Sequence, residues 1–117
     1  QLFSNLISNS LKYHSSEVAP KISIKSEQVT WDTIEAEFLK SAKIYHKITY
    51  TDNGIGFDNK NAGKIFEVFQ RLHPKTKYSG TGIGLAICKK IVENHRGYIH
   101  ASGELGKGSV FTIYLPA

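Results

Sequence analysis

The spacing of glycine constrains the fold of this chain more than any other feature of its sequence. Seven of the ten glycines fall in three tight clusters: Gly54/Gly56, Gly80/Gly82/Gly84 and Gly106/Gly108. Because glycine lacks a Cβ atom, such clusters let the backbone come close to a ligand or to another segment. They therefore predict tight loops in which the backbone comes close to a ligand or to another segment.

Length and composition favour one compact domain. The chain has 117 residues, of which 40% are hydrophobic, enough for a single core. No apolar run approaches the roughly 20 residues of a membrane-spanning helix, so we expect no direct membrane contact from this domain. The net charge of +5 is not gathered in a stripe interleaved with aromatic residues, which argues against a nucleic-acid partner. The lone Cys88 cannot form an internal disulfide, which favours a cytoplasmic location, whether or not the parent protein is membrane-anchored.

The periodicity of apolar residues predicts helices on one side of a mostly antiparallel sheet. Residues 1–14 and 82–95 have the pattern of amphipathic helices, and Gly97 is a candidate left-handed cap for the second. Alternating patterns predict strands at 21–25, 44–52, 98–102 and 109–115. Residues 28–43 fit either a short helix or a long hairpin loop.

Polar residues share one face of the first predicted helix. At about 100° per residue, Phe3, Ile7 and Leu11 form an apolar stripe that we expect to be buried. The opposite stripe carries Asn5, Asn9 and Lys12. An asparagine oxygen can ligate a hard cation, a lysine can bind phosphate, and the nearby Tyr13 can stack on a base. The same stripe also fits an ordinary solvated helix face, so taken alone it leaves both interpretations open.

Asp52 ends a predicted strand on the face that we expect to be buried. A buried carboxylate is costly unless it is hydrogen-bonded, so it either caps its own turn or serves as an acceptor at the floor of a pocket. Gly54 and Gly56 follow at once, and they would clear space for a flat ligand. A carboxylate beside such a backbone suits an exocyclic amine such as N6 of adenine.

The second glycine cluster leads directly into the helix predicted at 82–95. Free N–H groups and the dipole at a helix N-terminus favour phosphate, although a closely packed helix start would use the same glycines. The pattern is neither a dinucleotide-binding fingerprint nor a P-loop, because the flanking strand, acidic residue and Gly-Lys-Ser/Thr are lacking.

A short amphipathic piece, 64–72, interrupts the polar stretch before this cluster. Phe66 and Phe69 share one helical face and fit a small satellite core. The same piece could anchor a hinged lid from which Arg71 or the lysines 75 and 77 reach toward phosphates. The five histidines show no metal-ligand spacing and suggest no Ser–His–acid triad.

Five segments together resemble the sequence boxes of sensor histidine kinases. In chain order they are NLISNSLKY (5–13), DNGIGF (52–57), IFEVFQRL (65–72), GTGIGLA (80–86) and GKGSVFTIYLP (106–116), which resemble the N, G1, F, G2 and G3 boxes. Each box alone is weak, but their order and spacing cover almost the whole chain. The stretch from 69 to 92 is most similar to phytochrome-type and PAS-linked kinases.

The resemblance implies a fold and two ligands. The fold is an α+β two-layer sandwich, the Bergerat ATPase fold, with a mixed sheet of about five strands, three helices on one face and a lid. The expected ligands are ATP and Mg²⁺. Residues 1–117 would form one catalytic domain, with the start of its first helix and the dimerisation domain lying outside the chain.

The resemblance also assigns roles to particular residues. It implies that Asn9 holds Mg²⁺ against the triphosphate, that Asn5 and Lys12 act beside it, and that Asp52 reads adenine. The other residues expected to contact the nucleotide are Tyr13, Gly54, Gly56, Phe57, Arg71, Gly80, Thr81, Gly82, Ile83, Gly84, Leu85, Ser109 and Thr112.

The implied activity is phosphoryl transfer to a histidine of another domain. ATPases of the same superfamily have a general-base glutamate where this chain has Asn5, so ATP should be held for transfer and not hydrolysed. No histidine of this chain is followed by an acidic residue, as the family's phosphoacceptor is. We therefore expect the acceptor on a separate dimerisation domain, a response regulator served through that domain, and no autophosphorylation in isolation. The alternatives are a hydrolysing ATPase, an anti-sigma serine kinase and a non-enzymatic nucleotide-binding docking module.

Overall fold

The computed structural model describes residues 2–12, 18–34, 40, 42–62, 64–66 and 84–117. Its α-helices are α1 (Leu2–Lys12) and α2 (Gly84–Asn94). The strands are β1 (Ile22–Thr30), β2 (Ile44–Asp52), β3 (Tyr98–Glu104) and β4 (Gly108–Pro116). Three short 3₁₀ turns are η1 (Trp31–Thr33), η2 (Asn59–Asn61) and η3 (Lys64–Phe66).

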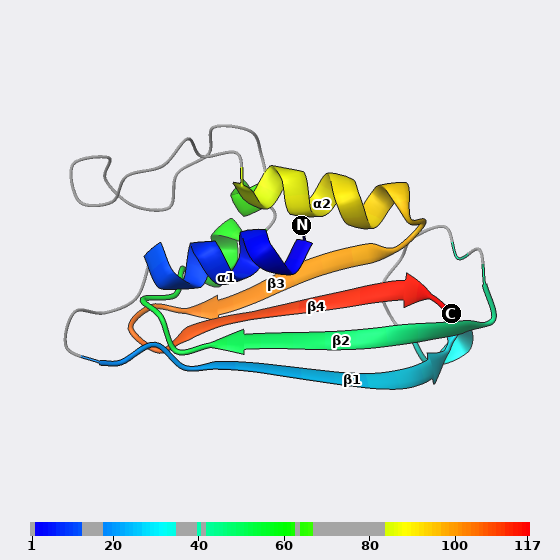
Figure 1. Cartoon of the computed structure of the whole chain (residues 1–117), viewed down its shortest axis with the longest axis horizontal. Helices are drawn as coiled ribbons and strands as arrows, with labels where there is room; N and C mark the ends of the chain where they lie inside the picture. The colour runs from blue at the N-terminus through cyan, green and yellow to red at the C-terminus, as the bar shows by residue number, and fades with distance from the viewer. Residues whose placement is uncertain (1, 13–17, 35–39, 41, 63, 67–83) are drawn as a thin grey trace.

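The strands form one antiparallel sheet in the order β1-β2-β4-β3. Both α-helices lie on the same face of this sheet (Figure 1). The α+β two-layer expectation is confirmed. In the described part of the chain the sheet has four strands, one fewer than expected, and every neighbouring pair is antiparallel, so it is not mixed. β2 and β3 run in the same direction, but they are not paired with each other because β4 lies between them.

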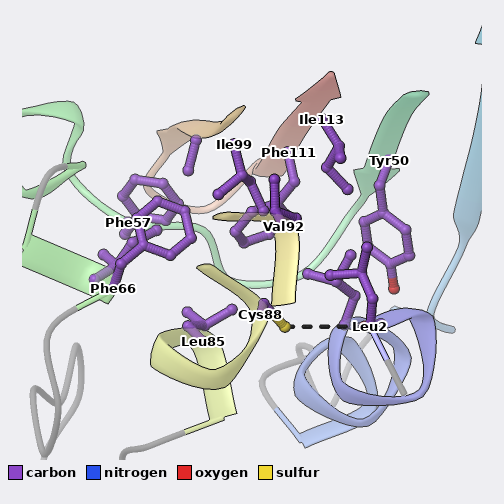
Figure 2. Packing of buried hydrophobic residues seen from close by; sticks show 13 residues of the cluster. Leu2, Tyr50, Phe57, Phe66, Leu85, Cys88, Val92, Ile99, Phe111 and Ile113 are labelled. Carbon is purple, nitrogen blue, oxygen red and sulfur yellow. Dashed lines mark hydrogen bonds between the residues drawn. The ribbon is translucent and has the colours of Figure 1, made fainter. Parts of the chain in front are cut away.

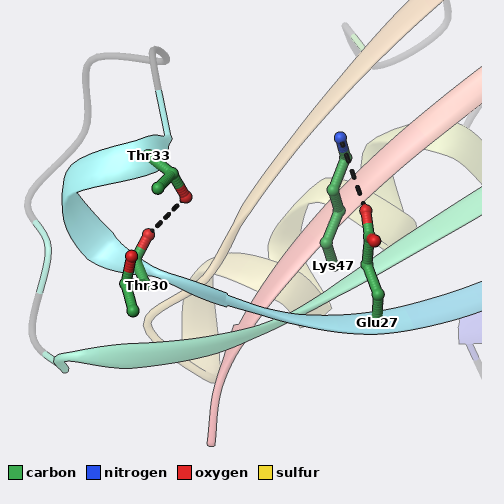
Figure 3. A network of polar contacts seen from close by, with 4 residues as sticks. All are labelled: Glu27, Thr30, Thr33 and Lys47. Atoms are coloured by element: carbon green, nitrogen blue, oxygen red, sulfur yellow. Dashed lines mark hydrogen bonds and ion pairs between the residues drawn. The ribbon is translucent and has the colours of Figure 1, made fainter.

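The strands are longer than their sequence patterns predicted, except for β2. The alternating pattern predicted residues 21–25, whereas β1 continues to Thr30 and passes directly into η1. Polar residues there are solvated: Figure 3 shows Lys47 reaching Glu27 across the strand pair, with Nζ and Oε1 3.9 Å apart, and Thr33 donating to the Thr30 carbonyl. Pairing with all nine residues of β2 holds this polar stretch extended, which the residue pattern alone does not reveal.

The main core lies between the helices and the sheet (Figure 2). The strands contribute Tyr50, Ile99, Phe111 and Ile113, and the rings of Tyr50 and Phe111 meet edge to face with centroids 6.2 Å apart. The helices contribute the side chains Leu2, Leu6, Leu85, Cys88 and Val92. This layer binds α1 and α2 to the sheet and fixes the end of β2, where Asp52 lies.

A second, smaller cluster covers part of the opposite face of the sheet. Ile34, Tyr45 and Tyr114 are buried there, with Val29 and Tyr98 packed beside them. Odd-numbered residues of β2 point to this face, as the strand alternation predicted. The segment that follows β1, for which the sequence allowed two interpretations, therefore supplies Ile34 to a second cluster.

Helix α1 is rotated relative to its predicted orientation. Leu6 and Ser10 are buried against the sheet, whereas Ile7 is 36% exposed and Leu11 is 53% exposed. The buried stripe is therefore displaced from the predicted apolar stripe by about one residue around the helix. The prediction was wrong because one member of the buried stripe, Ser10, is polar. That serine is buried at low cost since its hydroxyl is hydrogen-bonded to two residues of β2.

Helix α2 ends in a Schellman motif that differs from the predicted cap. The Gly97 N–H bonds to the Val92 carbonyl and the Arg96 N–H to the Glu93 carbonyl, each at 2.9 Å. The left-handed residue is Arg96, with φ of 61°, and not Gly97. Gly97 is required for a different reason, since a Cβ there would lie 2.2 Å from the Tyr114 carbonyl oxygen.

None of the described helices is long and apolar enough to cross a bilayer.

Replacing Arg96 with glycine should stabilise the domain. A left-handed backbone costs a side-chain-bearing residue roughly 1–2 kcal/mol, so we expect Arg96→Gly to raise the free energy of unfolding by about 1 kcal/mol. Urea denaturation measures this change. Glu93→Gly, within the same helix, is the control and should destabilise by about 1 kcal/mol. A loss of stability in both variants would contradict the assignment of strain to Arg96.

The thiol of Cys88 should be inert in the folded protein. Cys88 is fully buried and its Sγ faces the Leu2 carbonyl oxygen at 3.8 Å. Burial raises the pKa of the Cys88 thiol from 9.0 to about 11. Thiol reagents attack the thiolate, so labelling at pH 8 should be at least about a hundredfold slower than in urea. Equal labelling rates in the folded and unfolded protein would show that the core around α2 is open.

Candidate functional site

Asp52 is the buried carboxylate of the helix-facing side of the sheet. It is the last residue of β2 and is only 8% exposed. Strand alternation turns it to the same face as Ile48 and Tyr50, as the sequence predicted, and α1 covers it there. A carboxylate in this position needs donors, because an uncompensated buried charge is costly.

Three donors from three segments of the chain satisfy this carboxylate. Oδ1 accepts the N–H of Gly54 at 3.1 Å and the N–H of Ser109 at 3.2 Å. Oδ2 accepts the hydroxyl of Ser10 at 2.6 Å. The sequence left open whether Asp52 caps its own turn or serves a pocket, and the Gly54 contact shows that it does cap its turn. The contacts from α1 and β4 show that it also joins segments far apart in sequence.

Two residues of this network were not among the predicted site residues. Ser10 lies on the buried stripe of α1, and its Oγ is 2.8 Å from the hydroxyl of Tyr50, two residues before Asp52 on β2. Both side chains are buried. The sequence signal that could have indicated Ser10 is its position four residues after Leu6, on the same face of the helix. In the structure this face packs against the sheet.

The polar residues predicted for the site lie on α1, the helix that carries Ser10. Asn5 and Asn9 are half-buried, one helical turn apart, and the side-chain Nδ2 of Asn5 is buried without a partner among the described residues. Lys12 is the last residue of α1, and Tyr13 lies outside the described residues. A buried amide without a partner costs free energy, so Asn5 has capacity for one more acceptor.

The glycines after β2 have structural duties that the sequence did not reveal. Gly54 supplies an N–H to Asp52, whereas Gly56 has φ of 69°, and a Cβ there would lie 2.1 Å from the Glu104 carbonyl oxygen. Phe57 is buried in the core, where its ring fills the space beside Gly103. Gly56 thus allows two backbone segments to meet. This contact requires glycine at position 56 whether or not a ligand binds beside it.

The turn between β3 and β4 is hydrogen-bonded to the loop that follows β2. The Gly106 N–H bonds to the Ile55 carbonyl at 2.8 Å. Gly108 has φ of 133°, and a Cβ there would lie 2.1 Å from the Asp52 carbonyl oxygen. The first and third glycine clusters therefore form one packed unit that holds the end of β2.

The two predicted site residues of β4 lie on opposite faces of the sheet. Ser109 pairs with Asp52 and donates its N–H to that carboxylate. Thr112 pairs with Thr49 and His100 on the face away from the helices, so the structure does not bring it to this cluster. Successive residues of a strand point to opposite faces, and positions 109 and 112 are an odd number of residues apart. Their side chains therefore lie on opposite faces of the sheet.

The second glycine cluster is described only at its end. Gly84 begins α2, and Leu85 is buried in the main core. The expectations for Arg71, Gly80, Thr81, Gly82 and Ile83, including the lid, fall outside the described residues. In the described part, hydrogen bonds join Asp52 to Gly54 and Ser109, and Asn5 and Asn9 lie on the helix whose Ser10 bonds to the same carboxylate. The start of α2 lies on the same face of the sheet as α1 (Figure 1).

Two hollows lie near the same end of the sheet but on its other side. They measure about 330 Å³ and 570 Å³ and share Thr51, Asp52 and Lys107 in their walls. Thr51 and Ser102 point away from the helices, whereas the carboxylate of Asp52 points toward α1. Neither hollow is therefore the space that the carboxylate faces.

No cluster of three or more His, Cys, Asp or Glu side chains suitable for a metal occurs among the described residues. A cation bound mainly through substrate phosphates and waters needs no such cluster, and one amide oxygen can serve as its protein ligand. The half-buried Asn9 offers such an oxygen on the helix that carries Ser10.

Comparison with known proteins places the chain in a family. The model of the family described as histidine kinase-, DNA gyrase B- and HSP90-like ATPases matches residues 1–117. Cyanobacterial phytochrome A of Nostoc sp. is 47% identical over 116 residues, which cover 99% of this chain and 13% of that protein. Phytochrome-like protein Cph1 of Synechocystis sp. is 40% identical over 99% of this chain and 14% of that protein. The chain thus spans only a small part of the length of these relatives.

Solved structures give the same assignment for the fold. The catalytic domain of the histidine kinase ThkA matches with a TM-score of 0.67 and 26% identity, covering 99% of this chain and 65% of that one. ShkA, solved in complex with AMPPNP, matches with a TM-score of 0.68 and 22% identity, covering 98% of this chain and 20% of that one. The chain therefore belongs to the family of histidine kinase-, DNA gyrase B- and HSP90-like ATPases, and its relatives are phytochromes and sensor histidine kinases.

Proposed function

We propose that this chain binds Mg²⁺·ATP and donates the γ-phosphoryl group to a histidine of a separate dimerisation domain. The observation that carries the proposal is the buried carboxylate of Asp52, oriented by three donors beneath α1. A rigid acceptor at that depth suits the exocyclic amine of adenine. ShkA, which shares this fold over 20% of its own chain, was solved in complex with the adenine nucleotide AMPPNP, and this supports the proposal.

The polar face of α1 fits the triphosphate side of the ligand. The oxygen of Asn9 would hold Mg²⁺, and Nδ2 of Asn5, which is buried without a partner among the described residues, would donate to an anionic oxygen of the bound ligand. When bound, Mg²⁺ supplies positive charge that offsets the charge of the phosphates. Lys12, at the end of the same helix, would add a second positive charge.

Transfer is favoured over hydrolysis by the chemistry of Asn5. A hydrolysing ATPase needs a base that removes a proton from water, and an amide is not basic. The chain would therefore position the phosphoryl donor and offset its charge, while the acceptor histidine provides the nucleophile. The lack of a carboxylate at this position of α1 also separates the proposal from a conformational ATPase.

The acceptor is proposed to lie in another part of the parent protein. The matched relatives are far longer than this chain, which covers 13% and 14% of their lengths. A dimerisation domain carrying the histidine, and a response regulator that takes the phosphoryl group from it, would then be the partners. The cytoplasm is the proposed location of such a signalling domain.

Nucleotide binding should be visible as thermal stabilisation. A ligand at about a hundred times its Kd stabilises the folded state by about 2.7 kcal/mol, so Mg²⁺·ADP should raise the melting midpoint by several degrees. Mg²⁺·GDP is the matched control and should have little effect. An unchanged midpoint with saturating Mg²⁺·ADP would rule out the proposal.

The same preparation tests the fate of the phosphoryl group. With ATP labelled at the γ-position, label should appear on an added histidine-bearing acceptor domain, and little free phosphate should form without it. Rapid phosphate release without an acceptor would identify a hydrolysing ATPase instead.

Replacing Asp52 with asparagine should abolish binding and keep the fold. The amide oxygen can still accept from Gly54 and Ser109, but the amide nitrogen replaces the acceptor Oδ2 with a donor. We expect the affinity for ADP to fall at least about a hundredfold, because a buried donor would face a donor. Calorimetric titration gives the affinity, and circular dichroism checks the fold.

Asp58→Asn is the control for this substitution. Asp58 lies six residues after Asp52, in the loop that follows β2, and is less buried. It accepts the N–H of Lys60 and pairs with Nζ of the same lysine at 3.6 Å. Its replacement should leave ADP affinity unchanged. Full ADP affinity in Asp52→Asn would remove the carboxylate from the proposed site.

A further inference from the structure

A short relay of hydroxyl groups supports the carboxylate of Asp52 from one side. Tyr50, Ser10 and Asp52 form a chain in which the Tyr50 hydroxyl is 2.8 Å from Ser10 Oγ, and Ser10 Oγ is 2.6 Å from Asp52 Oδ2. All three residues are buried. None of the roles described above requires a serine or a tyrosine in these positions.

The direction of both hydrogen bonds follows from the donors available. An ionised carboxylate only accepts, so Ser10 must use its single hydroxyl proton toward Asp52. Tyr50 must then donate its own proton to Ser10 Oγ. Burial raises the pKa of the Tyr50 hydroxyl, which keeps that proton in place. Each hydroxyl therefore has one defined orientation: Tyr50 donates to Ser10, and Ser10 donates to the carboxylate.

Counting only the described residues, the donors to this carboxylate leave one acceptor position vacant. A carboxylate offers about four lone-pair positions, two on each oxygen. Oδ1 is filled by the N–H groups of Gly54 and Ser109, and Oδ2 already accepts from Ser10. The remaining position lies on Oδ2. It can accept one N–H, and it repels a carbonyl oxygen because both groups are acceptors.

We propose that Ser10, held by Tyr50, is a positioning residue that makes the site selective for a 6-amino purine over a 6-oxo purine. This inference rests on the nucleotide binding proposed above. Ser10 fixes the rotation of the Asp52 carboxylate, so that Oδ2 presents its one open acceptor position to the base. Without Ser10 the carboxylate has two open positions on Oδ2, and a water or a different purine edge can use them.

A merely structural role for Ser10 makes a different prediction. If the hydroxyl only attached α1 to the sheet, its loss would loosen the site and weaken every nucleotide by a similar factor. If it orients the acceptor, its loss weakens ADP much more than inosine diphosphate, which carries an oxygen in place of the 6-amino group. The ratio of the two affinities distinguishes these roles.

Calorimetric titration of the whole chain with ADP and with inosine diphosphate, both with Mg²⁺, tests the proposal. Wild type should prefer ADP strongly. Ser10→Ala should weaken ADP by about tenfold or more, the usual effect of losing a hydrogen bond to a charged group, and change inosine diphosphate less than threefold. The preference should therefore fall about tenfold.

Three further variants keep the test decisive if Ser10→Ala is unstable. Tyr50→Phe retains the ring and the Ser10–Asp52 bond, so it should reduce the preference less than Ser10→Ala does. The double variant Ser10→Ala/Tyr50→Phe leaves no buried hydroxyl without a partner and should reproduce the full effect. Ser8→Ala, at an exposed position of the same helix, should match wild type.

The outcomes separate this inference from the proposed function. Equal weakening of both nucleotides, or an unchanged preference in Ser10→Ala and in the double variant, overturns the role of Ser10 while ADP binding by wild type still stands. Absence of ADP binding by wild type overturns the proposed function, and this inference with it.

Discussion

The burial of one carboxylate is the constraint on which the rest of the structure depends. Asp52 is covered by α1, and its charge is tolerated because donors arrive from α1, from its own loop and from β4. An uncompensated charge at that depth would cost several kcal/mol. The first helix and the last strand must therefore both be seated before the end of β2 becomes stable. The same group links the packing of the fold to the recognition that we propose for it.

Close contact between backbones keeps that carboxylate in place. Gly56 meets the Glu104 carbonyl, Gly108 meets the Asp52 carbonyl, and the Gly106 N–H bonds to the Ile55 carbonyl. Two glycine clusters some fifty residues apart in sequence thus work as a single joint between the β2 loop and the β3–β4 turn. This contact explains the composition of these loops without a ligand, and it gives any ligand on the helix side a rigid floor.

The sequence predicted the arrangement of this domain better than its details. The bounds of β2, the alternation that turns Asp52 inward and the two-layer fold all follow from local patterns and from the order of the boxes. The rotation of α1 about its axis could not be predicted, because a serine such as Ser10 is expected on the solvent side of a helix. Only its hydrogen bonds to Tyr50 and Asp52 on β2 explain why it is buried. Arg96 took the left-handed position expected of Gly97, since the close approach to Tyr114 fixed which residue had to be glycine. Thr112 was grouped with Ser109 by the box, although the strand period turns it to the other face.

The order of strands has a consequence for how the domain acquires its shape. β4 is the last strand of the chain, yet it lies between β2 and β3 and contributes a donor to Asp52. Until β4 has been synthesised, a chain emerging from a ribosome therefore displays two additional unpaired strand edges, on β2 and β3, and an Asp52 carboxylate that lacks its Ser109 donor. Such edges are prone to pairing with other chains. Sheet closure and completion of the Asp52 shell would then be a single late event, and a nascent chain lacking that segment would be a natural client for chaperones.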